Sequence, residues 1–118
     1  MNTQALYTNV RMSQVLVHQD TVYLAGRFAD SAPLENDLHV QADNTLTAIE
    51  RLLVEAGTDK TRLLSATLYL KHIEADFAAM DLIWKQWLPQ GITPACATLE
   101  PDVLKPDILV EISIIAAL

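Results

Sequence analysis

Two short runs of apolar and β-branched residues near the N-terminus predict a β-hairpin. Residues 15–18 read Val-Leu-Val-His and residues 21–25 read Thr-Val-Tyr-Leu-Ala, with the polar pair Gln19-Asp20 between them. Such runs on either side of a two-residue polar link are typical of paired antiparallel strands, although this pair is not a preferred Asn-Gly or Asp-Gly turn. Gly26 ends the second run, and the stretch that follows, residues 27–33, predicts a loop.

A helical spacing of apolar residues comes after that loop. Over residues 34–56 apolar side chains recur every three or four positions, at Leu38, Ala42, Leu46, Ile49, Leu53 and Ala56. This period predicts one long amphipathic helix with Glu35 and Asp37 in its first turn, where the helix dipole favours anions, and with Gly57 just beyond its end. A second helix is predicted over residues 75–88, where a proline and a glycine follow the apolar stripe.

Apolar positions also predict the remaining strands. Residues 64–70 alternate between apolar and polar side chains, and residues 95–100 and 108–116 are two further strand segments. The order strand-strand-helix-strand-helix-strand-strand predicts one α+β domain over residues 1–118, with both helices on one face of a mixed sheet. No third helix remains to cover the other face, so we expect copies of the chain to associate through it.

Composition and charge narrow the possible partners. The 118 residues are 51% hydrophobic, which is a high apolar load for a small domain standing alone. Fifteen Asp and Glu residues outnumber eight Lys and Arg residues, and the net charge of −7 disfavours nucleic-acid binding because phosphates would be repelled. No stretch has the length and apolarity of a signal peptide or a membrane span, so we expect a cytoplasmic protein without membrane contact.

Glu111 is the most informative candidate residue, because it lies within an otherwise almost wholly apolar predicted strand. An ionised carboxylate is costly to bury alone, so such a residue faces water, pairs with a cation or acts as an acid or base. The single cysteine, Cys96, has no nucleophile signature around it and is interpreted as a small buried hydrophobe. The three histidines lack metal-ligand spacing and the three glycines form no phosphate-binding loop, so we expect no metal and no cofactor.

Several segments taken together resemble one known family. Residues 22–26 read Val-Tyr-Leu-Ala-Gly, residues 44–46 read Asn-Thr-Leu within the first predicted helix, and residues 76–80 read Asp-Phe-Ala-Ala-Met. With Pro94-Ala95 and the closing Val110-Glu111-Ile112, they resemble the RidA family, also called YjgF/YER057c/UK114, over nearly the whole chain. Each piece alone is weak, but the combination is specific.

The resemblance implies a chorismate-mutase-like fold and a homotrimer that binds small molecules in clefts between neighbouring subunits. Better-known members hydrolyse reactive enamines and imines, such as 2-aminoacrylate, to a 2-oxo acid and ammonia without a cofactor. In those members an arginine after Pro-Ala holds the substrate carboxylate and a backbone amide near the glycine of the second strand assists. A glutamate on the last strand handles the water or the imine proton.

Transferred to this chain, the match at the site is partial. Gly26 and Glu111 agree with the family, Glu111 as the candidate acid or base. The family's arginine falls on Cys96, and three further departures fall at ligand-binding positions: Met12, Thr98 and Asp81. Neither cysteine nor threonine supplies the cationic fork of an arginine. Arg27 is a candidate replacement, but a strand neighbour of Gly26 points to the opposite face, where a solvated or salt-bridged arginine is the simpler interpretation.

Two main functions remain open at this stage. One is an imine deaminase whose activity is altered or lost because Cys96 replaces the arginine. The other is a non-catalytic trimer that holds a small metabolite or a protein partner in the same clefts. RNA cleavage, which is sometimes attributed to the family, is disfavoured by the net charge of −7.

Overall fold

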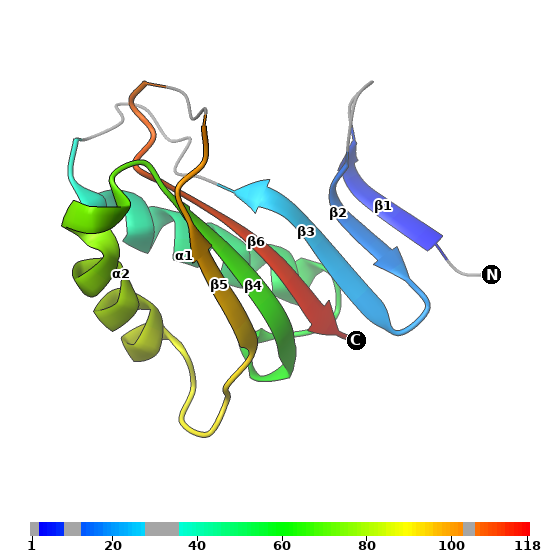
Figure 1. The fold of residues 1–118 in the computed structure, drawn as a ribbon. Helices are drawn as coiled ribbons and strands as arrows, with labels where there is room; N and C mark the ends of the chain where they lie inside the picture. The colour runs from blue at the N-terminus through cyan, green and yellow to red at the C-terminus, as the bar shows by residue number, and fades with distance from the viewer. Residues whose placement is uncertain (1–2, 9–12, 28–35, 103–105) are drawn as a thin grey trace.

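Strands and helices of the computed structural model form two layers (Figure 1). The structure describes residues 3–8, 13–27, 36–102 and 106–118. Within these residues the strands are β1 (Thr3–Thr8), β2 (Ser13–His18), β3 (Thr21–Arg27), β4 (Leu63–Leu70), β5 (Ala95–Leu99) and β6 (Val110–Ala117). The helices are α1 (Leu38–Glu55), the short 3-10 helix η1 (Lys60–Arg62) and α2 (Ile73–Trp87). No described helix is long and apolar enough to cross a membrane.

The six described strands make one mixed sheet in the order β1-β2-β3-β6-β4-β5. All neighbours are antiparallel except β4 and β5, which run parallel and are joined through α2. Both α1 and α2 pack on the same face, which confirms the predicted α+β class with two helices on a mixed sheet. The C-terminal strand β6 lies in the interior of the sheet, between β3 and β4 (Figure 1).

The first strand, β1, was not predicted. It pairs antiparallel with β2, with Leu6 opposite Val15 and Ala5 opposite Leu16. Its sequence, Thr-Gln-Ala-Leu-Tyr-Thr, mixes polar and apolar positions without a regular alternation, so the pairing with β2 and not a local pattern makes it a strand. The sheet therefore extends one strand beyond the predicted hairpin.

The boundaries of α1 differ from the prediction at one end. Asp37 is the N-cap, with extended backbone and a side chain that accepts a hydrogen bond from the Val40 amide at 3.2 Å. The helix therefore begins at Leu38, and Asp37 is not in its first turn, because capping needs a non-helical residue. Glu35 lies outside the described residues. At the other end Gly57 has a φ of +94°, the left-handed conformation expected after a helix.

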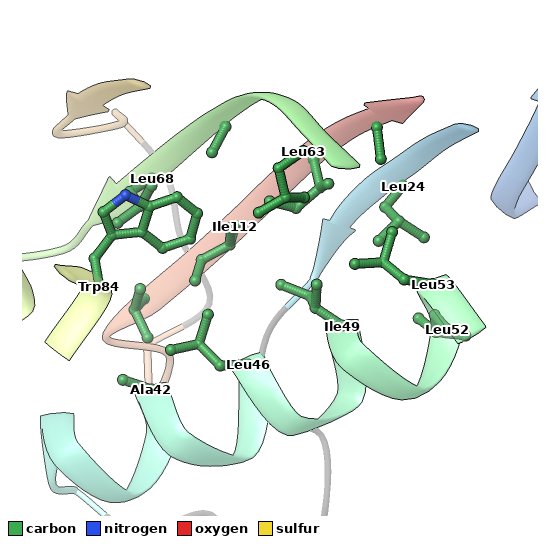
Figure 2. Close-up of a cluster of buried hydrophobic side chains, with 14 of the residues drawn as sticks. Leu24, Ala42, Leu46, Ile49, Leu52, Leu53, Leu63, Leu68, Trp84 and Ile112 are labelled. Atoms are coloured by element: carbon green, nitrogen blue, oxygen red, sulfur yellow. The ribbon is translucent and has the colours of Figure 1, made fainter. Parts of the chain in front are cut away.

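The core fills the space between the helices and one face of the sheet (Figure 2). From α1 the fully buried residues include Ile49 and Leu53, which point toward the inner face of the sheet beside Leu24 and Ile112. Trp84 of α2 covers the end of the sheet formed by Leu68 and its neighbours (Figure 2).

The opposite face of the sheet carries exposed apolar side chains and is called the open face here. Leu16, Tyr23 and Leu99 are 36%, 41% and 49% exposed. Tyr23 is in register with Leu16 on β2 and with Ile115 on β6, so the three side chains form a row across three strands. Neither described helix packs against this row. Contiguous apolar surface of this kind marks interaction sites more often than free surface.

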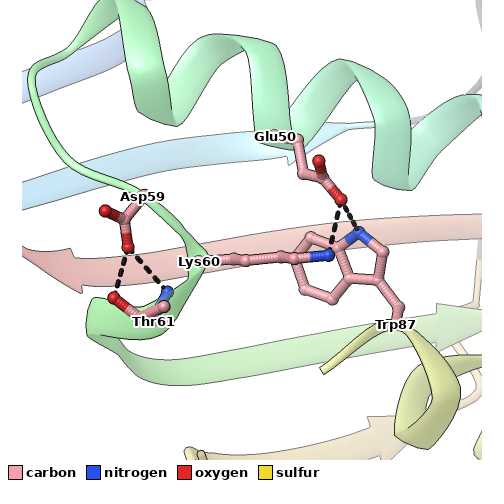
Figure 3. A network of polar contacts seen from close by, with 5 residues as sticks. All are labelled: Glu50, Asp59, Lys60, Thr61 and Trp87. Carbon is pink, nitrogen blue, oxygen red and sulfur yellow. Dashed lines mark hydrogen bonds and ion pairs between the residues drawn. The ribbon is translucent and has the colours of Figure 1, made fainter. Parts of the chain in front are cut away.

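A polar network joins α1, η1 and α2 at the edge of the core (Figure 3). The Glu50 carboxylate accepts hydrogen bonds from Lys60 Nζ at 2.8 Å and from Trp87 Nε1 at 2.7 Å. Lys60 Nζ also lies 5.1 Å from the centroid of the Trp87 ring. These contacts hold the C-terminal end of α2 against the middle of α1.

Truncation of Ile49 measures how much the contact between α1 and the sheet contributes. Ile49 is fully buried, so Ile49→Ala should lower the free energy of unfolding by about 2–5 kcal/mol. Val54 lies on the same helix but is 66% exposed, and Val54→Ala should change that free energy by no more than about 0.5 kcal/mol. Denaturant titration followed by circular dichroism, at one protein concentration, measures both. Equal losses would contradict the packing of α1 through Ile49.

Candidate functional site

Glu111 is the second residue of β6 and projects onto the open face. Its neighbours in the strand, Val110 and Ile112, are fully buried on the helix face, and side chains alternate along a strand. Glu111 is half-buried, and that burial raises the pKa of its carboxyl group above the ordinary value of a glutamate. Such a carboxyl group holds its proton to higher pH than an exposed one and can donate it.

Tyr69 is the register partner of Glu111 on β4, and it was not singled out from the sequence. The two residues share the open face because directly opposed residues of neighbouring strands do. Leu99 on β5 is in turn paired with Tyr69, so the row of Glu111, Tyr69 and Leu99 runs to the edge of the sheet. The alternation predicted for β4 could have placed Tyr69 on this face, but not opposite Glu111.

Gly26 lies near Glu111, on the neighbouring strand β3. The register between β3 and β6 shifts between Leu24 and Arg27, and Arg27 is paired with Ile112. Gly26 therefore belongs to a local irregularity, where backbone groups leave the regular ladder of hydrogen bonds. The side chain of Arg27, the candidate replacement for the family's arginine, lies outside what the structure describes.

Cys96 and Thr98 lie on β5, at the edge of the sheet, and belong to the helix face. Cys96 is in register with Ala66 and Thr98 with Leu68, and both of these partners are buried beneath the helices. The interpretation of Cys96 as a small buried residue is wrong, because β5 is an edge strand and the thiol is exposed. Its partial burial still raises the pKa of the thiol, and the Asp81 carboxylate raises it further. This thiol is therefore protonated near neutral pH, which disfavours a nucleophilic role.

Asp81 is on α2, on the same side of the sheet as Cys96. Its carboxylate raises the pKa of the Cys96 thiol, and it also pairs with Lys85 Nζ at 2.9 Å, one turn further along the helix. The cation of Lys85 is thus already engaged by Asp81. Where the resemblance expects an arginine, this chain presents a thiol beside a carboxylate.

The predicted site residues therefore form two groups within one chain. Glu111 lies on the open face beside the backbone of Gly26, whereas Cys96, Thr98 and Asp81 lie on or next to the helix face. The sheet separates the groups. Met12, another predicted ligand-binding residue, falls outside the described residues.

Two grooves elsewhere on the described part of the chain contain none of the predicted site residues. A groove of about 480 Å³ between α1 and α2 is lined by residues such as His39, Asp43 and Trp87, none of which was predicted to bind a ligand. A second, of about 490 Å³, lies at the start of α2 beside His72 and Glu100. Within the described part of the chain no three His, Cys, Asp or Glu side chains gather as metal ligands would.

Comparisons with known proteins agree with the fold. The family model described as Endoribonuclease L-PSP matches residues 2–118. The RutC family protein YoaB of Escherichia coli strain K12 is 36% identical over 107 residues, which are 91% of this chain and 90% of that protein. The crystal structure of NMB1025 from Neisseria meningitidis, a member of the YjgF protein family, superposes with a TM-score of 0.88 at 31% identity, covering 99% of this chain and 95% of that one.

A relative with a named activity also matches. The 2-iminobutanoate/2-iminopropanoate deaminase of Capra hircus is 32% identical over 108 residues, covering 88% of this chain and 77% of the goat protein. The family model matches almost every residue, and the alignments with these relatives cover most of both chains. The chain therefore belongs to the RidA (YjgF/YER057c/UK114) family.

Proposed function

We propose that this protein hydrolyses imines or enamines, with a substrate range altered by the residues that replace the family's arginine. Membership of the RidA family supports a role in small-molecule metabolism, and the similarity to the goat deaminase suggests the reaction. The observation that carries the proposal is Glu111, a half-buried carboxyl group of raised pKa on the open face of a strand that is otherwise almost wholly apolar.

The reaction needs one proton donor and one water molecule. The protonated Glu111 carboxyl group donates its proton to the imine nitrogen while water adds to the imine carbon, which forms a carbinolamine. The Glu111 carboxylate takes a proton from the added water and passes it to the amino nitrogen of the carbinolamine. The carbon–nitrogen bond then breaks to release ammonia, while the remaining hydroxyl proton returns to Glu111 and leaves a carbonyl compound. An enamine first takes a proton on carbon to become the imine. Every step uses water and protons alone.

The assembly in this proposal is a homotrimer with clefts between subunits. Within one chain the sheet separates Glu111 from Cys96 and Thr98, so a cleft that contains both groups takes them from two copies. The apolar row on the open face, with Tyr23 at its centre, supports association through that face. The backbone at Gly26 then supplies an amide beside the Glu111 carboxyl group.

The substrate in this proposal is a neutral or cationic imine. A carboxylate substrate is normally held by the two-pronged cation of an arginine, and Cys96 offers no charge. The Asp81 carboxylate next to Cys96 would repel an anion, and Lys85 is already paired with Asp81. The usual 2-imino acids of the family are therefore poor substrates here.

The absence of a cation at Cys96 and the nearby Asp81 carboxylate also favour a second candidate function. If the loss of the arginine has abolished turnover, the trimer binds a small metabolite or a protein partner in its clefts without reaction. RNA is not proposed as a substrate in either case, because the net charge of −7 repels a phosphate backbone.

A substitution on the open face tests whether the trimer forms through that face. Tyr23→Asp should break the trimer, because it places a charge in the middle of the apolar row. Sedimentation equilibrium should give three times the chain mass of 13.1 kDa for the unchanged protein and a smaller mass for the variant. Val54→Asp, at an exposed apolar position of α1, is the matched control and should remain trimeric. A monomeric unchanged protein, or two variants of equal mass, would refute association through this face.

The acid–base role can be tested by Glu111→Gln, which keeps the shape of the side chain and removes its titration. The variant should hydrolyse imines about 10²–10⁴-fold more slowly. An amino-acid oxidase supplies 2-imino acids, an amine oxidase supplies imines without a carboxylate, and semicarbazide traps whatever the protein leaves. Glu74→Gln, at an exposed position of α2, is the control. If the unchanged protein leaves the semicarbazone yield constant for every imine, hydrolysis is wrong and the binding function remains.

The missing cation can be restored by Cys96→Arg. We expect kcat/KM for 2-imino acids to rise at least tenfold, since a charge-assisted pair contributes about 2–5 kcal/mol. Adding Asp81→Asn should raise it further by removing the repelling carboxylate. Cys96→Met adds bulk without charge and should give no gain. If neither the single nor the double variant gains activity, the altered charge at Cys96 does not limit the substrate range.

A further inference from the structure

The segment that leads into β6 is held by one buried side chain of α1. Gln41 is only 1% exposed, and both the nitrogen and the oxygen of its carboxamide form hydrogen bonds. Gln41 Nε2 donates to the backbone carbonyl of Asp107 at 2.9 Å, and Gln41 Oε1 accepts from the backbone amide of Leu109 at 2.9 Å. These two groups flank Ile108, which is itself buried. The clamp links α1 to residues more than sixty positions later in the chain.

The end of β4 holds the same segment. The Lys71 amide donates to the Leu109 carbonyl at 3.0 Å, and Lys71 Nζ donates to the Pro106 carbonyl at 2.5 Å. Beyond this point the ladder between β4 and β6 continues with Leu70 opposite Val110. The approach to β6 is thus fixed from the helix layer and from the sheet.

Glu111 follows the clamped segment by two residues, at the start of β6. Within the described residues, β4 pairs with Glu111 through Tyr69, whereas the pairing with β3 comes no nearer than Ile112. The end of a strand frays more readily than its centre. The clamp on Leu109 therefore restrains the end of β6 that carries Glu111.

We propose that Gln41 is a positioning residue for Glu111, acting through its two hydrogen bonds to Asp107 and Leu109. This inference rests on the proposed function as far as catalysis is concerned, but the placement of Glu111 can be measured without it. The backbone of Gln41 is itself fixed in the first turn of α1, because its amide donates to the Asp37 carbonyl at 3.0 Å. The clamp thus transmits the position of α1 to the carboxyl group on the far side of the sheet.

The test is Gln41→Met, which keeps the length of the side chain and removes both hydrogen bonds. We expect the protection of the Leu109 amide against hydrogen exchange to fall at least tenfold. We also expect the pKa of Glu111, followed by carbon-13 NMR of its carboxyl group, to move down toward the ordinary value as water gains access. In the imine assay kcat should fall at least tenfold with KM within about twofold, because misplacement of a catalytic group by an ångström is costly.

Thr45→Val is the matched control. Thr45 is fully buried one turn further along α1, and its hydroxyl bonds only within the helix at 2.7 Å from the Gln41 carbonyl. It should cost stability but leave the Leu109 amide and the pKa of Glu111 unchanged. In a conservative variant, Gln41→Glu, the ionised carboxylate has no donor for the Asp107 carbonyl. As the pH falls, the protonated carboxyl group should regain that bond and restore the full clamp with the protection of Leu109.

The outcomes separate the two proposals. If no imine is hydrolysed by the unchanged protein, the proposed reaction fails, and the NMR measurements still decide the role of Gln41. If Gln41→Met leaves the pKa of Glu111 unchanged while Leu109 loses protection, or if Thr45→Val shifts that pKa equally, Gln41 is not a positioning residue. If Gln41→Met does not fold, the pH-dependent protection of Leu109 and the pKa of Glu111 in Gln41→Glu decide instead, and their constancy overturns the proposal.

Discussion

Burial of one face of β6 is the constraint on which the rest of the molecule depends. This strand lies between β3 and β4, and its inward residues Val110, Ile112 and Ile114 pack against the helix layer with almost no exposure. Since side chains alternate along a strand, burial of these residues forces Glu111 onto the open face. A slip of one residue would exchange the two sets and bury the carboxylate in the core, at a cost that fixes the register.

The same alternation explains why the predicted site residues lie on two faces of the sheet. β5 is parallel to β4, and its register puts Cys96 beside Ala66, on the face opposite to Glu111. Neither group can reach the other through a sheet whose interior is packed. The chain presents two groups of predicted site residues, one on each face of the sheet, together with an exposed apolar row that includes Tyr23. This arrangement is what the proposed intersubunit cleft requires.

Much of the fold could be predicted from periodicity, because periodicity records which side chains are buried. The repeat through Leu46 and Ile49 predicted α1, alternation predicted β4, and an almost wholly apolar run predicted β6. The elements that periodicity misses are missed for physical reasons. β1 is a strand because β2 pairs with it, and α1 begins after Asp37 because that side chain caps it. The site residues could be named singly from the sequence, but their division between two faces depends on register between strands distant in the chain.

Gln41 shows what kind of residue such patterns miss. It occupies a buried position on α1 where periodicity expects an apolar side chain, and Thr45, one turn on, does the same. A buried polar group without a partner is destabilising, so each such residue implies a hydrogen bond that the pattern alone cannot direct. Thr45 satisfies its hydroxyl within the helix, whereas Gln41 reaches the backbone at Asp107 and Leu109. The polar residue at position 41 therefore interrupts the hydrophobic pattern because it makes a long-range contact. That contact lies next to the strand that carries Glu111.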